Sequence, residues 1–351
     1  MATATLTDAP APPALPALLL AAPLAAMLAA LTGTPASARV LQAGPGQEYE
    51  LPSAAAAAAQ DGDTVNIAPG EYFDCAIWHA SHLTIAAEGA GATLTDKACV
   101  GKAAFVIEGD GVTLRNLGFA RIRVPDGNGA GIRAEGRDLT VISSRFDNDQ
   151  VGILAGGGGA LRIEDCSFTA NGVSPDGKPT HAVLAGAIDL LAVSNSRFNH
   201  ARGGDHIASA ARRTELRTSQ LADEGGRMTG ALVHVWGTEA VLDGNTFTLA
   251  AGAAARPGVV LATGDAAQIT LRGNTLAAPD GSVPLLRNWA GADVTASANT
   301  VPPGGEAVSD SGATYRRLRA RAAALREAAG DAARVLRHLA AQAARGLGVI
   351  R

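Results

Sequence analysis

The chain has 351 residues, of which 4% are aromatic and 42 are glycine, a composition that disfavours a helical bundle and suits short strands joined by tight turns. Its formal net charge of −4 provides no positive field of the kind that nucleic-acid partners require. This length can bury a large core, and the internal repeat described below predicts one long domain at residues 39–312.

Residues 1–38 are predicted to form an export signal peptide. The run from Leu15 to Leu31 is apolar and rich in alanine, and the small-x-small pattern at Ala36–Ala38 predicts a cleavage site. The run is too short and too interrupted by proline to favour a membrane span. No lysine or arginine precedes it, so a disordered Ala/Pro leader is the alternative. We expect a periplasmic or secreted mature protein without an integral membrane span.

The stretch Leu51–Gln60 is predicted to form a short helix with Ser53 as its N-cap. A solenoid exposes apolar core and strand edges at its ends, so a helix at this place would cover the first coil.

The three cysteines fit an exported protein. Cys75 and Cys99 flank the first predicted strands and are expected to form a disulfide bond in an oxidising compartment. Cys166 lies in a strand motif that faces the core, where a lone cysteine behaves as a small apolar residue. No Cys-x-x-Cys motif or His/Cys cluster is present, so the sequence predicts no zinc site.

An internal repeat of 22 to 30 residues runs through the chain. Its motif has the form apolar-x-x-small/polar-x-apolar, and a second short strand such as GIRAEG, HIASAA or LVHVWG precedes most copies. The copies are LRNLGF (114–119), VISSRF (141–146), IEDCSF (163–168), VSNSRF (193–198), LRTSQL (216–221), LDGNTF (242–247), LRGNTL (271–276) and ASANTV (296–301). This period, with two or three short strands in each, indicates a parallel β-helix; the leucine-rich-repeat consensus and its helices are missing.

The fourth position of the motif is predicted to form a polar ladder. Its members are Leu117, Ser144, Cys166, Ser196, Ser219, Asn245, Asn274 and Asn299. Stacked coils bring equivalent residues into register about 4.8 Å apart, so Ser and Asn side chains can satisfy the backbone of a buried turn. The Phe and Leu residues that close the motif are expected to stack inside the same coils.

Residues 313–351 are rich in alanine and arginine and are predicted to form a helical tail. Two roles are open for this tail. It is either a C-terminal cap with solvated arginines, or a basic amphipathic arm that contacts an anionic membrane or polymer.

Four stretches of the chain resemble a known family. DCAIWHASHLTI, GKAAFVIEGDGVTLRNLGF, VPDGNGAGIRAEGRDLTV and NSRF resemble exported bacterial right-handed parallel β-helix proteins of the pectate-lyase-like superfamily, and the similarity runs from about residue 40 to residue 276. The resemblance implies an all-β fold, a single-stranded right-handed parallel β-helix. It also implies polysaccharide metabolism, in which family members act mostly as lyases or hydrolases of acidic sugars, so we expect an acidic polysaccharide as the partner.

One outward face of the coils gathers the candidate functional side chains. Because side chains alternate along a strand, neighbours of an inward column point outward. The inward column is assigned to Ile132, Leu154, Leu184, Ile207 and Val233. The predicted catalytic residues are His181, His206, His234 and Arg212. The predicted substrate-binding residues are Arg133, Glu135, Lys178, Asp205 and Trp236.

These residue types suit an extended anionic sugar chain, because Trp stacks on sugar rings and Arg pairs with carboxylates. Uronate β-elimination needs a cation or metal that neutralises the carboxylate, a base that takes the C5 proton and a donor for the leaving oxygen. His206 or His234 would be the base. The carboxylate would be held by Arg133, Arg212 or Lys178.

The coil of His206 departs from the pattern of the family. Relatives often resemble H-x-I-K-S-R-A in this coil, and their cationic positions correspond here to Ala208 and Ala210. Alanine neither neutralises a carboxylate nor moves a proton. The alternative function is therefore a non-catalytic β-helix that binds or escorts a polysaccharide or has a structural role at the surface.

Hydrolysis and metal binding have less support in the sequence. Hydrolysis needs two facing carboxyl groups, and the spacing of Asp205, Glu135 and Asp189 predicts no such pair. No cofactor is predicted. A calcium site is a weak alternative in the region of VPDGNGAG, which lacks the regular acidic spacing of a calcium loop. The residues concerned are expected in Asx turns and are Asp126, Asn128 and Asp149.

Overall fold

The structure is a computed structural model, and it describes residues 38–172, 180–223, 230–251, 258–279 and 283–310. From Arg39 on, these residues belong to one compact unit. The predicted signal peptide up to residue 37, the loop that contains Lys178 and the predicted tail at 313–351 lie outside the described residues.

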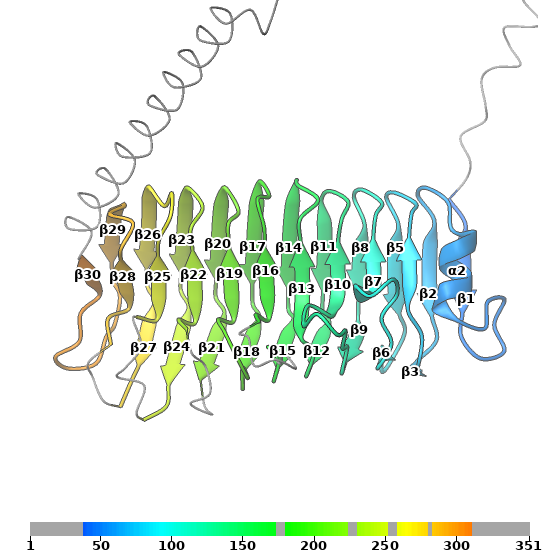
Figure 1. The fold of residues 1–351 in the computed structure, drawn as a ribbon, viewed down its shortest axis with the longest axis horizontal. Helices are drawn as coiled ribbons and strands as arrows, with labels where there is room; N and C mark the ends of the chain where they lie inside the picture. Colours follow the sequence, from blue (N-terminus) through cyan, green and yellow to red (C-terminus); the bar gives the residue numbers. More distant parts are fainter. Residues whose placement is uncertain (1–37, 173–179, 224–229, 252–257, 280–282, 311–351) are drawn as a thin grey trace, which may run out of the picture. The chain divides into compact units, whose positions relative to one another are not determined.

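The described chain forms a parallel β-solenoid of three sheets, named A, B and C in the order in which each coil visits them (Figure 1). Sheet A contains β1 (Val40–Ala43), β2 (Thr64–Ile67), β5 (Thr84–Ala87), β8 (Thr113–Arg115), β11 (Leu139–Ile142), β14 (Ala160–Glu164), β17 (Leu190–Ser194), β20 (Arg213–Arg217), β23 (Glu239–Asp243), β26 (Gln268–Arg272) and β29 (Asp293–Ser297). Sheet B contains β3 (Gly70–Tyr72), β6 (Ala92–Thr95), β9 (Leu117–Ala120), β12 (Arg145–Asp147), β15 (Ser167–Thr169), β18 (Arg197–Asn199), β21 (Gln220–Asp223), β24 (Thr246–Leu249) and β27 (Thr275–Ala277). Sheet C contains β4 (Ala76–Trp78), β7 (Ala103–Ile107), β10 (Ala130–Ala134), β13 (Val151–Ala155), β16 (Val183–Ala185), β19 (Ile207–Ser209), β22 (Val233–Val235), β25 (Val260–Ala262), β28 (Leu286–Asn288) and β30 (Val308–Asp310).

Each coil adds one strand to each sheet, and the pairing is parallel, as β10 shows with β7 and β13. Connections between parallel strands of one sheet are right-handed in nearly all proteins. The all-β, right-handed parallel β-helix predicted from the repeat and from the family resemblance is confirmed, with about ten turns in the described residues.

Aromatic rings stack through the core behind sheet B. Phe119, Phe146, Phe168 and Phe198 close four successive copies of the sequence motif, and each is 1% exposed. Their ring centroids follow one another at 5.2, 4.6 and 4.5 Å. Large apolar rings in register supply burial and ring stacking together, so this column confirms the predicted apolar stack and fixes the register of the coils.

The predicted polar ladder lies beside this column, at the turn from sheet A to sheet B. Leu117 N–H donates to Ser144 Oγ at 3.2 Å, and Asn245 N–H donates to Asn274 Oδ1 at 3.0 Å. Cys166 belongs to the same ladder, and its Sγ accepts a hydrogen bond from Ser144 N–H. Burial raises the pKa of the Cys166 thiol to about 12. The ladder residues are structural, because each polar side chain among them satisfies a backbone group that the turn buries.

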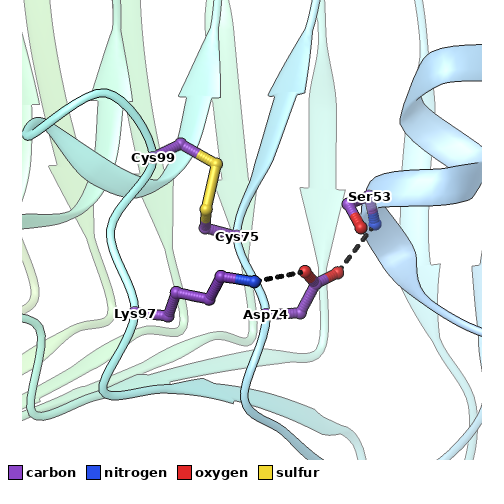
Figure 2. The surroundings of a disulfide bond; sticks show 5 residues. All are labelled: Ser53, Asp74, Cys75, Lys97 and Cys99. Carbon is purple, nitrogen blue, oxygen red and sulfur yellow. Dashed lines mark hydrogen bonds and ion pairs between the residues drawn. A yellow bond between two sulfur atoms is a disulfide. The ribbon is translucent and has the colours of Figure 1, made fainter.

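The N-terminal end differs in detail from the prediction. Helix α2 spans Pro52–Ala58, and Leu51 is its N-cap without a side-chain capping bond, so the assignment of Ser53 as N-cap is wrong. The Ser53 backbone N–H instead donates to the buried carboxylate of Asp74 at 2.8 Å (Figure 2). Pro52 occupies the first helical position, so the N-cap lies two residues before Ser53, and an acceptor from a neighbouring coil replaces the local cap.

The predicted disulfide bond joins Cys75 and Cys99, 24 residues apart, in the segments that precede β4 and β7 (Figure 2). Lys97 approaches Asp74 beside it, with 3.6 Å between Nζ and Oδ1. The bond therefore ties two adjacent coils together next to the contact that anchors α2. Cys166 is free and buried, as expected.

The inward column of sheet C is partly misassigned by the sequence. Ile132, Ile207 and Val233 do share it. The members from the two intervening coils are Ile153 and Val183, whereas the predicted Leu154 and Leu184 lie on the outer face. Both leucines pack against a small apolar cluster there, so their hydrophobicity does not report an inward position.

Candidate functional site

The outer face of sheet C carries a row of side chains that we call the central row. From β10 to β28 its members are Arg133, Leu154, Leu184, Ala208, His234, Leu261 and Arg287. Between the two arginines at its ends, the row is apolar except for His234, because the residues in β13, β16, β19 and β25 are leucine and alanine. His234 is therefore the polar member in the middle of this row.

Two histidines and a carboxylate meet at that point. Asp205 Oδ2 lies 3.5 Å from His181 Nδ1 and 3.7 Å from His234 Nδ1. The side chains of the two histidines are 22% and 26% exposed, whereas the Asp205 side chain is only 8% exposed. The carboxylate thus forms the floor between two half-buried imidazoles, and we call these three residues the His–Asp–His cluster.

The hydrogen bonds of the cluster set the protonation of His181. The Asp205 backbone N–H donates to His181 Nδ1 at 3.1 Å, so that nitrogen is an acceptor and Nε2 carries the proton. Burial lowers the pKa of His181 below its usual value, and the opposing attraction of Asp205 does not reverse the shift. At neutral pH His181 is therefore a neutral side chain with its N–H at Nε2.

His234 is held from both sides. Its Nε2 lies 2.9 Å from Thr263 Oγ1, a hydroxyl of the next coil, and its Nδ1 faces the Asp205 carboxylate. A proton on Nδ1 avoids repulsion between a lone pair and the carboxylate, and it leaves the Nε2 lone pair for the threonine hydroxyl. The Trp236 ring packs edge-on against the imidazole with 4.8 Å between the ring centroids.

His206 is not part of this face, and its prediction as an outward catalytic residue is wrong. It is 1% exposed, its Nε2 donates to the Ala222 carbonyl at 2.9 Å, and its ring lies 5.8 Å from that of Phe198. His206 precedes the first residue of β19, so the alternation of side chains within a strand does not extend to it. At the equivalent place in an earlier coil, a Cβ on Gly152 would lie 2.9 Å from the Phe168 ring, so this position faces the aromatic core.

The predicted substrate-binding cations are not brought to the cluster. Arg133 and Glu135 do face outward, but they pair with each other, and Glu135 also accepts a hydrogen bond from Lys102 at 2.7 Å. Arg133 is four strands from His234, which corresponds to about 19 Å. Arg212 is exposed in the turn after β19.

The two alanines that depart from the family pattern have different positions. Ala208 is fully buried in the central row beside His234, and Ala210 follows β19 at the edge of the sheet. The central row therefore has no cation in β13, β16, β19, β22 or β25. Within the described ranges, no group of three or more His, Cys, Asp or Glu side chains could hold a metal ion.

The loop residues weighed as weak calcium ligands have structural contacts. Asn128 N–H donates to the Asp126 carboxylate at 3.3 Å, which is the expected Asx turn. Asp149 is not in such a turn. It is fully buried and accepts a hydrogen bond from Ile122 N–H at 2.9 Å, so it belongs to the wall of the solenoid.

A groove of about 590 Å³ lies elsewhere, on the outer face of sheet B. Its charged lining includes Arg121, which is already paired with Glu71 at 2.9 Å and with Asp96 at 2.7 Å. This groove does not include the histidines. It was also not predicted, because short strands with alternating small and polar residues give no sign in the sequence that they form a concavity.

Two more residues of this face were not predicted from the sequence. Thr263 bonds His234 from the following coil, and its partnership depends on register that is set across a 29-residue repeat. Trp289 is exposed at the edge of sheet C, two coils after Trp236. The chain has only three tryptophans, and this rarity was the one feature of the sequence that could have drawn attention to Trp289.

No helix in the described part of the chain is long and apolar enough to cross a membrane.

A scan against protein-family models and a search of curated proteins return no match. Among solved structures, the alginate lyase from Paenibacillus sp. str. FPU-7 has a TM-score of 0.57 at 15% identity, with 78% of this chain and 98% of that chain covered. The PL6 family alginate lyase AlyGC has a TM-score of 0.53 at 18% identity, with 76% of this chain and 40% of that chain covered, so this chain spans less than half of AlyGC. Likeness at such identity concerns the architecture of the chain. The chain shares the parallel β-helix fold of these two alginate lyases.

Proposed function

We propose that the protein binds an acidic polysaccharide along the outer face of sheet C, at the His–Asp–His cluster and Trp236. The observation that carries this proposal is the buried Asp205 carboxylate between two half-exposed imidazoles, one of which packs against a tryptophan. The neutral His181 offers its Nε2–H to a ligand oxygen, and the Trp236 ring offers an apolar surface to a sugar. Asp205 orients both imidazoles, His181 through its backbone N–H and His234 through its carboxylate, and such an arrangement is suited to holding a ligand.

A lyase reaction is the second candidate, and the orientation of His234 favours it. His234 Nε2, released from Thr263, would take the C5 proton of a uronate, the electron pair would form the C4–C5 double bond, and the C4–O bond would break. His181 Nε2–H would then protonate the leaving oxygen. Ala208 stands against this candidate, because the central row supplies no positive charge for the substrate carboxylate beside His234.

We also propose that the protein works in the periplasm or outside the cell. The Cys75–Cys99 bond supports this location, because such bonds persist in oxidising compartments.

The first prediction concerns ligand binding. Trp236→Ala and His234→Ala should each weaken binding to alginate, pectate or a glycosaminoglycan by roughly 30-fold, because both remove groups at the centre of the site. Affinity would be measured by calorimetry with the purified protein, and unsaturated uronate products would be followed by ultraviolet absorbance in the same samples. His79→Ala, an exposed histidine paired with Glu108, serves as the matched control and should bind normally.

The results separate the two candidates. Binding without unsaturated product supports a binding protein, and product that disappears in His234→Ala supports the lyase. If no acidic polymer binds, or if Trp236→Ala and His234→Ala bind as tightly as the wild type, the proposed function is wrong.

A second prediction concerns pH. The pKa of His181 is lowered, so this side chain gains its charge only when the pH falls below the usual histidine range near 6.5. A uronate is still ionised there, so its affinity should rise roughly tenfold as the pH falls, in line with one charge-assisted hydrogen bond. His181→Gln should abolish this rise, whereas His79→Gln should keep it. An affinity that is independent of pH in the wild type would contradict the assigned role of His181.

A further inference from the structure

A second row on the outer face of sheet C extends from the cluster toward the C-terminal coils. Thr263 N–H donates to Val235 O at 3.0 Å and Trp289 N–H donates to Ala262 O at 3.0 Å, which continues the parallel ladders of β22, β25 and β28 by one residue. Trp236, Thr263 and Trp289 are therefore in register, and we call them the aromatic row. The backbones of the two tryptophans are two strand spacings apart, about 10 Å.

Trp289 has an exposed ring although the chain has few aromatic residues. Its exposed fraction is 37%, and it is one of five large apolar residues that are exposed among those the structure describes. It does not sit on a loose loop, because Asn288 is buried and its side-chain oxygen accepts hydrogen bonds from Gly291 N–H and Ala292 N–H. The fold thus holds an apolar ring toward solvent in a fixed turn, a costly arrangement for packing and a favourable one for stacking on a ligand.

The other tryptophan is held as closely. A Cβ on Gly264 would lie 2.8 Å from Trp236 Cβ, and the φ of Gly264 is +64°. Glycine at this position lets the turn after β25 approach the tryptophan. The backbone that carries both tryptophans is therefore fixed, and less conformational entropy is lost when a ligand stacks on their rings.

A cation accompanies Trp289. Arg287 is two residues earlier in β28 and belongs to the central row, in register with Leu261 and, through it, with His234. Its Nη1 donates to Ser309 Oγ at 2.8 Å, which directs the guanidinium along the outer face. A guanidinium has five N–H donors in a planar fork that matches a carboxylate, so an arginine beside an exposed ring is suited to a sugar that carries a carboxylate.

We infer that Arg287 and Trp289 form a second uronate subsite, so that a polyuronate lies along the solenoid axis from the His–Asp–His cluster over Thr263 to Trp289. This inference rests on the proposed function and gives it a substrate class and a direction. Trp236 and Trp289 stack on two sugar rings of one chain, and Arg287 pairs with the carboxylate of the sugar on Trp289. The ligand is an oligouronate that is long enough to span three coils.

The experiment measures affinity against the length of the ligand. Oligouronates of increasing length, prepared from alginate and from pectate, are titrated into the full chain. Affinity for the shortest oligomers should be equal in the wild type, Trp289→Ala and Arg287→Gln. Once the oligomer spans both tryptophans, the wild type should gain about tenfold in affinity and the two variants should not. Phe73→Ala removes an exposed aromatic at the N-terminal end and is the matched control, with wild-type affinity at every length.

Tryptophan fluorescence gives an independent readout. Trp78 is fully buried, so changes on ligand addition come from Trp236 and Trp289. In Trp236→Phe, long oligomers should still change the emission of Trp289 and short oligomers should not. Circular dichroism of each variant verifies that the solenoid is folded.

The outcomes distinguish the two levels of the proposal. If Trp289→Ala and Arg287→Gln keep the gain with length while Trp236→Ala loses binding, the second subsite is wrong and the proposed function stands. If the wild type binds no oligouronate of any length, the proposed function fails and this inference fails with it. A gain with length that vanishes in both variants supports the subsite.

Discussion

Asn274→Ala should destabilise the protein by about 4 kcal/mol, because the side chain makes four hydrogen bonds, three of them buried and one partly buried, and each contributes about 1 kcal/mol. Asn274 Oδ1 accepts from Asn245 N–H at 3.0 Å and from Asn245 Nδ2 at 2.9 Å. Asn274 Nδ2 donates to Leu242 O at 2.9 Å and to Asn299 Oδ1 at 3.0 Å. The residue is fully buried, so water does not replace the lost partners.

Urea unfolding followed by circular dichroism measures this loss. Asn274→Ser should lose less than Asn274→Ala, because a serine hydroxyl occupies the same ladder at Ser219 and accepts from Ser196 N–H at 3.1 Å. Gln268→Ala, at an exposed position of β26, is the control and should unfold like the wild type. An Asn274→Ala variant as stable as this control would show that the ladder contributes little to stability.

Asp149→Asn should stabilise the protein by about 3 kcal/mol at alkaline pH, since an ionised carboxylate without a partner is costly inside a protein. Asp149 is the acidic member of a second ladder, at the turn from sheet B to sheet C. Its Oδ1 accepts from Ile122 N–H at 2.9 Å, whereas its buried Oδ2 is without a partner among the described residues. Asparagine supplies an N–H at the position of that oxygen.

The geometry of the ladders identifies the group that Oδ2 faces. In the next coil, Asn171 Oδ1 accepts from Asp149 N–H at 2.9 Å and Asn171 Nδ2 donates to Phe146 O at 3.0 Å. Phe146 is in register with Phe119, so the Phe119 carbonyl is the equivalent partner for Asp149. A carbonyl accepts and does not donate, so Asp149 can imitate asparagine only with a proton on Oδ2.

The sign of the pH dependence follows from the pKa of Asp149. Burial raises this pKa well above the usual value, and the hydrogen bond from Ile122 and the charge of Arg123 oppose the shift without cancelling it. Asp147 adds to the increase, and Arg121 opposes it weakly. Because the folded pKa exceeds the unfolded one, the contribution of Asp149 is complete below about pH 4 and is lost as the pH rises through the folded pKa.

Unfolding free energies at a series of pH values test this second prediction. Asp149→Asn and the wild type should be similar near pH 4 and diverge as the pH rises, because asparagine does not titrate. Asp293→Asn changes an exposed carboxylate of β29 and should leave the difference between acidic and alkaline pH unchanged. Equal stability of Asp149→Asn and the wild type at alkaline pH would mean that Asp149 is ionised without penalty.

The sequence alone determined the architecture, because the solenoid repeats one local pattern. The motif that ends in Phe146, Phe168 and Phe198 recurs wherever a coil passes from sheet A to sheet B, so its spacing reports the coil length directly. The ladder was predictable for the same reason, because it depends on the residue type at one repeated position. The Cys75–Cys99 bond was predictable because the two cysteines flank the first strands of the solenoid.

The tertiary structure alone decided which candidate side chains meet. The loops from sheet B to sheet C vary in length. The sequence therefore does not show at which residue of each sheet C strand the alternation of inward and outward side chains begins. His206 therefore turned out to face the core, while His181 reached Asp205 from the preceding coil. Trp289 lies in one row with Trp236, two coils away, because β22 pairs with β25 and β25 pairs with β28. These two pairings connect positions that are 53 residues apart in the sequence. Repeated positions specify the fold locally, whereas the site depends on register between coils, which is set by the packing of the whole stack.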